Sequence, residues 1–137
     1  MNTFFHGHTY TGNQLVCSIA LENIKLFEKD NLISHIQTTS QTLKHRLNKL
    51  KSHKNVGDVR GRGLMFGVEL VKDKQSKEPL DISTVEIIVY TCKDHGLMIR
   101  NLENVITFVP ILSMSKKEIK TMVKIFEKAL HQTLSKK

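Results

Sequence analysis

The sequence predicts an α/β domain of the two-layer α+β type, a small, mostly antiparallel sheet with helices on one face. Apolar residues recur at helical spacing over residues 15–27 and 30–51, and residues 64–70 alternate with the period of a strand. Two Ser-x-x-Glu patterns, Ser83–Glu86 and Ser115–Glu118, have the form of capping boxes that begin further helices. The predicted order is helix, helix, strand, helix, strand, strand, helix, and its natural packing places the helices on one face of the sheet.

The composition is that of one globular domain. The chain has 137 residues, of which 39% are apolar and 25% charged, which allows a single modest core. No run of about 18 apolar residues occurs, and the N-terminal residues lack the charged and apolar regions of a secretory signal. We therefore expect a cytoplasmic protein without a membrane partner, in which residues 1–137 form a single domain.

The cysteines and histidines predict no metal site. Cys17 and Cys92 both fall inside apolar helical patterns, so we expect two reduced core thiols. No Cys-x-x-Cys pair occurs, and the seven histidines do not stand at zinc-ligand spacings with the cysteines.

The formal net charge of +8 raises the question of an anionic partner. Part of this charge lies near the end of the predicted helix 30–51, where the helix dipole favours cations. No aromatic stacking motif, helix-turn-helix or zinc-finger spacing accompanies it. We expect a solvated basic face and no nucleic-acid partner. The alternative is a free-standing module that binds an anionic partner.

The first predicted helix has an unusual apolar pattern. Residues 1–11 form an irregular segment, and the Asn13 side chain is predicted to cap the helix that follows. Residues 15–27 are apolar on nearly every side, and such a helix is buried against more than one neighbour. Because a chain of this size offers few neighbours, we expect a missing domain or a partner subunit to cover part of the helix.

Local signals predict the next elements. Asp30 is expected to cap the second helix, and a turn-rich bridge, residues 56–63, leads into the strand 64–70. Gly96 stands where the C-terminus of a helix requires a left-handed residue.

Residues 6–13 combine features that favour a phosphate group. They read His-Gly-His-Thr-Tyr-Thr-Gly-Asn and lead into a predicted helix N-terminus. Free backbone N–H groups, the positive end of the helix dipole and threonine hydroxyls all favour an anion. The alternative is an ordinary capped loop.

Arg100 is the second candidate for a binding residue. Two short strands are predicted at residues 97–100 and 105–109, joined by residues 101–104, so Arg100 ends the first of them. An arginine at this position can form two parallel hydrogen bonds with a carboxylate, although a surface arginine is the alternative. No acid, base and nucleophile cluster in the sequence, and we predict no catalytic residue within the chain.

These two places carry a resemblance to a known family. Residues 6–15, which end in Asn-Gln-Leu, resemble the segment that opens the C-terminal part of class III aminotransferases, which depend on pyridoxal phosphate. Residues 56–70 resemble the glycine-punctuated strand of that family, and residues 96–110 resemble its closing hairpin. The final Ser-x-x-Glu helix also matches, so the resemblance covers essentially the whole chain. Gln14 departs from the pattern, because the family commonly has proline there.

The resemblance implies the C-terminal small domain of a fold-type I enzyme, with residues 1–11 as a cofactor-phosphate loop and residues 12–137 as the small domain. Thr9 matches the threonine that binds the phosphate of pyridoxal 5'-phosphate across the dimer. His8 stands beside it and would help by its backbone. Arg100 matches the arginine that binds the carboxylate of an oxononanoate substrate.

The first motif is most similar to the biotin-pathway branch of the family. Enzymes of that branch convert 8-amino-7-oxononanoate to 7,8-diaminononanoate, with S-adenosylmethionine or lysine as the amino donor. The resemblance implies that the Schiff-base lysine and the aspartate facing the pyridine nitrogen belong to an upstream large domain, so this chain alone is expected to be inactive. The expected partners are that domain, a second subunit of a homodimer, an amino donor and a keto acid. An ornithine, acetylornithine or 4-aminobutyrate transaminase is the alternative within the family.

Overall fold

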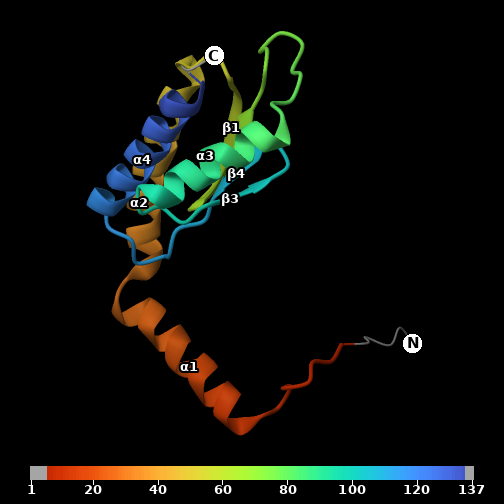
Figure 1. The fold of residues 1–137 in the computed structure, drawn as a ribbon. Coiled ribbons are helices and arrows are strands. Elements are labelled where there is room, and N and C mark those ends of the chain that lie inside the picture. The colour runs from red at the N-terminus through yellow and green to blue at the C-terminus, as the bar shows by residue number, and fades with distance from the viewer. Residues whose placement is uncertain (1–5, 135–137) are drawn as a thin grey trace. The chain divides into compact units, whose positions relative to one another are not determined.

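The computed structural model describes residues 6–134 and divides the chain into two compact units, Met1–Ile33 and Ser34–Lys137 (Figure 1). The predicted organisation, a single domain with residues 1–11 as a cofactor-phosphate loop and residues 12–137 as the small domain, stays a prediction. In the described part of the chain, no helix is long and apolar enough to cross a membrane.

The first unit contains α1 (Gln14–Lys29). The predicted cap is confirmed, because Asn13 Oδ1 accepts a hydrogen bond of 3.1 Å from the backbone N–H of Val16. No residue of α1 is buried within the chain, although most of its apolar side chains are large. The expectation that a further domain or subunit covers this helix stays a prediction.

The junction between the first two helices differs from the prediction at Asp30. This residue does not cap the second helix but ends α1, and its backbone N–H donates to the carbonyl oxygen of Leu26. Asn31 then takes a left-handed conformation with a φ of 47°, and α2 (Leu32–Lys49) begins. Asparagine tolerates that conformation better than most residues, so this turn forms without glycine.

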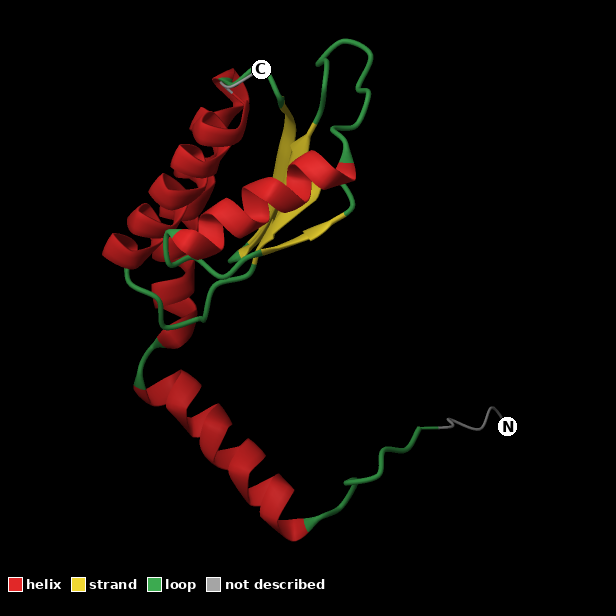
Figure 2. Cartoon of the chain, viewed as in Figure 1, coloured by secondary structure: helices red, strands yellow, loops and turns green. Residues whose placement is uncertain are grey.

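The second unit is a sheet of four strands with helices on one face. After α2 its elements are η1 (Leu50–Ser52), β1 (Val56–Arg62), β2 (Met65–Leu70), α3 (Ile82–Asp94), β3 (Arg100–Leu102), β4 (Val105–Phe108) and α4 (Lys116–Leu134). The strand order is β1-β2-β4-β3, every pair is antiparallel, and α3 lies across the sheet in Figure 2.

One core holds this unit together. Buried side chains of β1, β2 and β4 join those of α2, α3 and α4 in a single cluster, with Phe108 and Phe126 edge to face at 5.2 Å between ring centroids. The opposite face of the strands carries the exposed and half-buried residues. The predicted fold class, a small antiparallel sheet with helices on one face, is therefore confirmed.

β1 corrects the prediction of a turn-rich bridge over residues 56–63. Glycines favour turns, but two of the three glycines here lie within the strand, and Gly57 marks a bulge in its pairing with β2. A Cβ atom on Gly61 would lie 2.3 Å from the carbonyl oxygen of Met65, so close strand packing requires glycine there. Gly63 alone lies in the turn, with a φ of 58°.

β3 begins later than predicted. The expected strand 97–100 is mostly unpaired, and the expected loop 101–104 contains most of β3 and the turn to β4. Leu97 and Ile99 pack against the core from the unpaired segment, so their alternation reflects burial rather than strand pairing. Glu103 makes the tight turn with a φ of 51°.

The two predicted capping boxes have different outcomes. The box at Ser115 is confirmed: its N–H donates to Glu118 Oε2 at 2.8 Å, and the Glu118 N–H donates to Ser115 Oγ at 3.3 Å. The box at Ser83 is wrong, because the N-cap of α3 is Asp81, two residues earlier, and Asp81 makes no side-chain capping hydrogen bond to the helix.

The end of α3 agrees with its prediction, whereas the cysteines agree only in part. Gly96 follows α3 with a φ of 83°, the left-handed conformation expected there. Cys92 is buried in the core, and this burial raises the pKa of its thiol to about 11. Cys17 is exposed, so its assignment to the core is wrong: it lies on α1, which has no buried residue. Both thiols are free.

Candidate functional site

The predicted phosphate loop is a compact turn in the first unit. The Thr11 N–H donates to the carbonyl oxygen of His8 at 2.9 Å, and the His8 N–H donates to Thr11 Oγ1 at 2.9 Å. Gly12 follows with a φ of 75°. These reciprocal bonds hold the backbone on both sides of Thr9, whose exposed hydroxyl has no hydrogen-bond partner within residues 6–134.

The N-terminus of α1 is suited to an anion. Its first turn contains no acidic residue. Asn13 satisfies two of the first N–H groups, because its side chain accepts from Val16 and its carbonyl oxygen accepts from Cys17. The earlier N–H groups, at Gln14 and Leu15, remain available by the geometry of a helix end. Together with the free Thr9 hydroxyl, they have the donor chemistry that a phosphate group requires.

Arg100 lies in the second unit, at the start of the edge strand β3. Its backbone pairs with Thr107 of β4, and Thr107 Oγ1 donates to the Arg100 carbonyl oxygen at 3.1 Å. Thr107 alternates with the buried Ile106 and Phe108, so Arg100, opposite Thr107, belongs to the open face of the sheet. The Arg100 side chain is exposed and has no ion-pair or hydrogen-bond partner in the described part of the chain.

A second arginine occupies the same row of the sheet. The register pairs Arg60 with Gly67, Gly67 with Thr107 and Thr107 with Arg100, so the two arginines stand on opposite edge strands. Three strand spacings of about 4.8 Å separate their backbones by roughly 14 Å. Gly67, between them, has no side chain.

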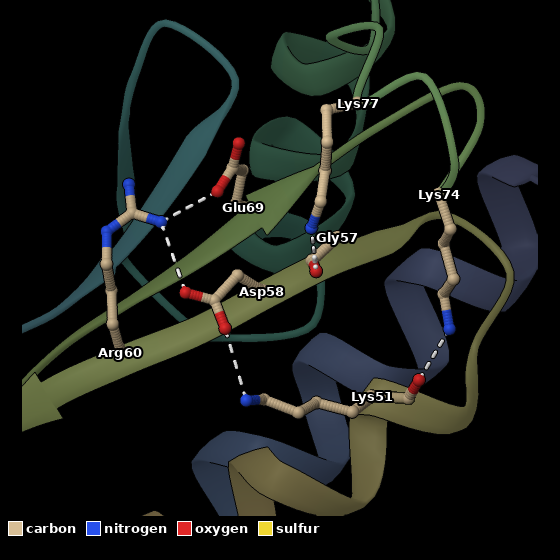
Figure 3. Close-up of polar contacts among 7 residues, drawn as sticks. All are labelled: Lys51, Gly57, Asp58, Arg60, Glu69, Lys74 and Lys77. Carbon is tan, nitrogen blue, oxygen red and sulfur yellow. Dashed lines mark hydrogen bonds and ion pairs between the residues drawn. The ribbon is translucent and has the colours of Figure 1, made fainter.

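The two arginines differ in their charge environment (Figure 3). Arg60 Nη1 donates to Glu69 Oε2 at 2.7 Å and lies 3.6 Å from Asp58 Oδ2. Lys51 Nζ lies 3.1 Å from the other oxygen of Asp58. The charge of Arg60 is thus compensated within the chain, whereas the charge of Arg100 is free for a ligand.

Titration behaviour follows from these contacts. The hydrogen bond from Lys51 is the largest cause that lowers the pKa of Asp58. The hydrogen bond to Glu69 is the largest cause that raises the pKa of Arg60. The side chains are partly exposed to solvent, so each pair stabilises the fold by no more than about 1 kcal/mol.

Sequence reasoning missed both the Asp58–Arg60–Glu69 network and the contact of Thr107 with Arg100. The alternation of charged residues with buried ones along β1 and β2 is the signal that could have found the network. The contact with Thr107 depends on strand register, for which the sequence carries no local signal. Thr9 and His8 lie in the first unit and Arg100 in the second. Within residues 6–134, no group of three or more His, Cys, Asp or Glu side chains could hold a metal ion.

Comparison with known proteins gives a consistent result. The family described as aminotransferase class-III matches residues 1–130. The adenosylmethionine-8-amino-7-oxononanoate aminotransferase of Staphylococcus aureus is 72% identical over 137 residues, which is 100% of this chain and 30% of that protein. The protein of the same name from Methanocaldococcus jannaschii is 48% identical over 117 residues, which is 84% of this chain and 25% of that protein.

Solved structures agree with this match. The crystal structure of the Methanocaldococcus jannaschii protein aligns with a TM-score of 0.86 at 44% identity, covering 94% of this chain and 30% of that one. The structure of a Vibrio fluvialis aminotransferase in its PMP-bound form aligns with a TM-score of 0.89 at 32% identity, covering 97% of this chain and 30% of that one.

The chain spans 30% or less of the length of these relatives. The match nevertheless extends over nearly all of its own residues, including both candidate binding segments. The chain therefore belongs to the class III aminotransferase family.

Proposed function

We propose that the polypeptide containing this chain is an aminotransferase of biotin biosynthesis. It would convert 8-amino-7-oxononanoate to 7,8-diaminononanoate, with S-adenosylmethionine or lysine as the amino donor. The observation that carries this proposal is the 72% identity, over all 137 residues, to the Staphylococcus aureus protein of that name. In line with the resemblance, we further propose a cytoplasmic homodimer in which a large domain supplies the lysine and aspartate of the reaction.

Arg100 would bind the carboxylate of the acceptor. A guanidinium group forms two parallel hydrogen bonds with a carboxylate. This geometry fixes the orientation of the acid, and the positive charge of the guanidinium balances that of the carboxylate. The free guanidinium of Arg100 supports this role. Arg60, in the same row of the sheet, already has two carboxylate partners, so Arg100 is the arginine of that row that is available to a ligand. An acceptor held at its carboxylate would present its ketone at a fixed distance along its carbon chain.

Thr9 and His8 would hold the phosphate of pyridoxal 5'-phosphate. Class III aminotransferases depend in general on this cofactor, which supplies the electron sink for moving an amino group. The Thr9 hydroxyl would donate to a phosphate oxygen, and the N-terminus of α1 would stabilise the negative charge. His8 would act through its backbone, since its N–H holds the turn around Thr9 by donating to Thr11.

Substitution of Arg100 tests the acceptor site. In the whole enzyme, Arg100→Ala is expected to raise the KM of the oxononanoate acceptor about 10- to 100-fold, the effect of losing hydrogen bonds to a charged group. The KM of the amino donor should change far less. Arg60→Ala is the matched control, because it removes an arginine from the same row whose charge is already compensated. An unchanged acceptor KM in Arg100→Ala, or an equal rise in both variants, would contradict the role of Arg100.

A cofactor measurement tests Thr9 separately. Thr9→Ala is expected to release pyridoxal phosphate faster during dialysis, followed by the absorbance of the bound cofactor, and Thr9→Ser should retain it. Equal retention in all three proteins would contradict the role of Thr9.

Another class III activity is the alternative function. Its substrate would be ornithine, acetylornithine or 4-aminobutyrate in place of the oxononanoate acceptor. Product analysis of the whole enzyme with each amino donor and acceptor decides between them.

A further inference from the structure

Two histidines from distant parts of the chain meet beside the start of β1. His53 follows η1 and His131 lies on α4, and their rings stand edge to face with 5.3 Å between the centroids. Both side chains line a pocket of about 240 Å³ in the second unit. His53 is half-buried and His131 is exposed, so a change of pH in the solvent reaches this histidine pair.

One hydrogen bond determines which nitrogen of the His53 ring carries the proton. The backbone N–H of Asn55 donates to His53 Nδ1 at 3.2 Å, so this nitrogen is an acceptor and the neutral ring has its proton on Nε2. A protonated imidazole carries N–H groups on both nitrogens and accepts no hydrogen bond. Protonation of His53 therefore removes the acceptor of the Asn55 N–H and places two donors against each other.

Asn55 connects this turn to the sheet. Its carbonyl oxygen accepts from the N–H of Val71 at 2.9 Å, and its side-chain amide donates to the carbonyl oxygen of Val71 at 2.9 Å. Asn55 is buried, and Val71 directly follows β2. The next residue, Val56, begins β1 and donates its N–H to the His53 carbonyl oxygen at 3.1 Å. A movement of the His53 ring consequently acts on the place where β1 begins and β2 ends.

Cations from three segments surround the His53 ring. Lys54 is its neighbour in the chain, Lys74 belongs to the loop after β2, and His131 belongs to α4. Lys74 is held in this region because its Nζ donates to the carbonyl oxygen of Lys51 at 2.6 Å (Figure 3). Burial is the largest cause that lowers the pKa of His53, and the charges of His131, Lys54 and Lys74 lower it further.

The other charged residues of the pocket do not balance a proton on His53. They are Lys49 from α2 and Glu127 from α4. Glu127 forms no ion pair or hydrogen bond within residues 6–134, and Lys49 adds a further positive charge. A proton gained by His53 thus has no carboxylate partner in the described part of the chain.

We propose that the histidine pair is a proton-sensitive device that releases the start of β1 in mildly acidic solution. The neutral His53 ring accepts from Asn55 and packs against His131. The protonated ring loses that hydrogen bond among cations, so it leaves its position and the turn of residues 53–56 opens. This inference goes beyond the proposed aminotransferase function and does not rest on it.

The sign of the effect follows from linkage. The pKa of His53 is lowered from an ordinary value of 6.5 in the folded state, so the unfolded state binds more protons over the range between the two values. The stabilisation is complete above the ordinary pKa and disappears as the pH falls through the lowered one. The turn should therefore open as the solution becomes acidic.

Hydrogen exchange at the backbone amides of Asn55 and Val56 tests the proposal in the polypeptide as its source produces it. After correction for the intrinsic exchange rate, their protection should fall between about pH 7.5 and about pH 5.5 by up to about tenfold, the ceiling that linkage sets for one group with an unfolded pKa near 6.5. His53→Asn should abolish this pH dependence, because asparagine offers an acceptor oxygen near the position of Nδ1 and does not titrate. His45→Asn, at an exposed histidine of α2, is the matched control and should keep it.

A titration of the histidine rings by NMR keeps the test independent of whether His53→Asn folds. The His53 ring, identified by its contact with the Asn55 N–H, should titrate below 6.5 in the unaltered protein. His131→Gln should move this titration upwards, because it removes a neighbouring cation. A His53 titration at or above 6.5 would overturn the proposal. An equal loss of protection in His53→Asn and in the unaltered protein would overturn it as well.

Discussion

Thr107 Oγ1 donates a hydrogen bond of 3.1 Å to the carbonyl oxygen of Arg100, across the pair formed by β3 and β4. β3 is a short edge strand, so this side-chain bond adds to the few backbone bonds that hold Arg100 in register. Because Arg100 is the proposed carboxylate-binding residue, the bond connects the stability of a strand end to the position of that residue.

Thr107→Val is expected to lower the free energy of unfolding by no more than about 1 kcal/mol, because the bond is exposed and valine keeps the branched shape that strands favour. Denaturant unfolding measures the change. Thr107→Ser, which keeps a hydroxyl, is the control and should retain more of the stability. A larger loss in the serine variant than in the valine variant would show that the methyl group, and not the hydrogen bond, matters at this position.

Gly61→Ala is expected to destabilise the second unit by about 1–3 kcal/mol, the usual cost of overpacking. The new Cβ atom would lie 2.3 Å from the Met65 carbonyl oxygen, and this backbone atom cannot move without disturbing the β1–β2 pairing. Gly67→Ala is a graded control, since its Cβ atom would lie 3.0 Å from one methyl group of Val105. Urea unfolding of the two variants should rank Gly61→Ala as the less stable, and the reverse order would contradict this account of β1.

Lys51→Met is expected to raise the pKa of Asp58 towards its ordinary value, because the variant removes the ammonium group that lies 3.1 Å from the carboxylate. The sign follows from linkage: a carboxyl group with a lowered pKa in the folded state stabilises the fold above its ordinary pKa of about 3.9, and this contribution disappears as the pH falls through the lowered value. The variant should therefore lose less stability on acidification than the unaltered protein.

Carboxyl chemical shifts followed through a pH titration measure the pKa of Asp58 in Lys51→Met directly. Lys54→Met is the control, because Lys54 has no carboxylate partner in the described part of the chain. If the two variants titrate alike, the ion pair does not cause the shift.

Cys92 is expected to make stability fall in alkaline solution. Burial raises the pKa of its thiol to about 11, so the folded state keeps the proton over a range where the unfolded state has lost it. The free energy of unfolding should decrease as the pH rises from about 8.5 towards the raised value. Cys92→Ala should be less stable at neutral pH, because it leaves a cavity, but its stability should decline less over that range than that of the unaltered protein.

Denaturant unfolding at several pH values checks this slope, and thiol modification gives a second readout. The exposed Cys17 should react with a thiol reagent well before Cys92. Equal rates at the two cysteines in the folded protein would contradict the burial of Cys92.

Features with a local cause could be predicted from the sequence. Asn13 caps α1 and Ser115 caps α4 because each bonds to atoms only three residues away. Gly96 follows α3 because the chain there takes a left-handed conformation, which glycine adopts without the steric conflict that a Cβ atom would cause. A local pattern alone is not sufficient: the box at Ser83 fails because α3 already begins at Ile82 and leaves Ser83 inside the helix.

Features that depend on strand pairing could not be predicted from the sequence. The glycines of β1 suggest turns in the sequence, so the strand was not predicted. In the structure these glycines are explained by close packing against β2 and by a bulge. The bounds of β3 depend on its register with β4. Leu97 and Ile99 alternate because both pack against the core, although neither lies in a strand.

The sequence by itself determined the order of most elements, the helix caps at Asn13 and Ser115 and the motifs that identify the family, because each depends on neighbouring residues or on a short pattern. Only the tertiary structure decided which arginine is available. Arg60 and Arg100 have the same chemistry, but strand register brings Asp58 and Glu69 to one of them and leaves the other free.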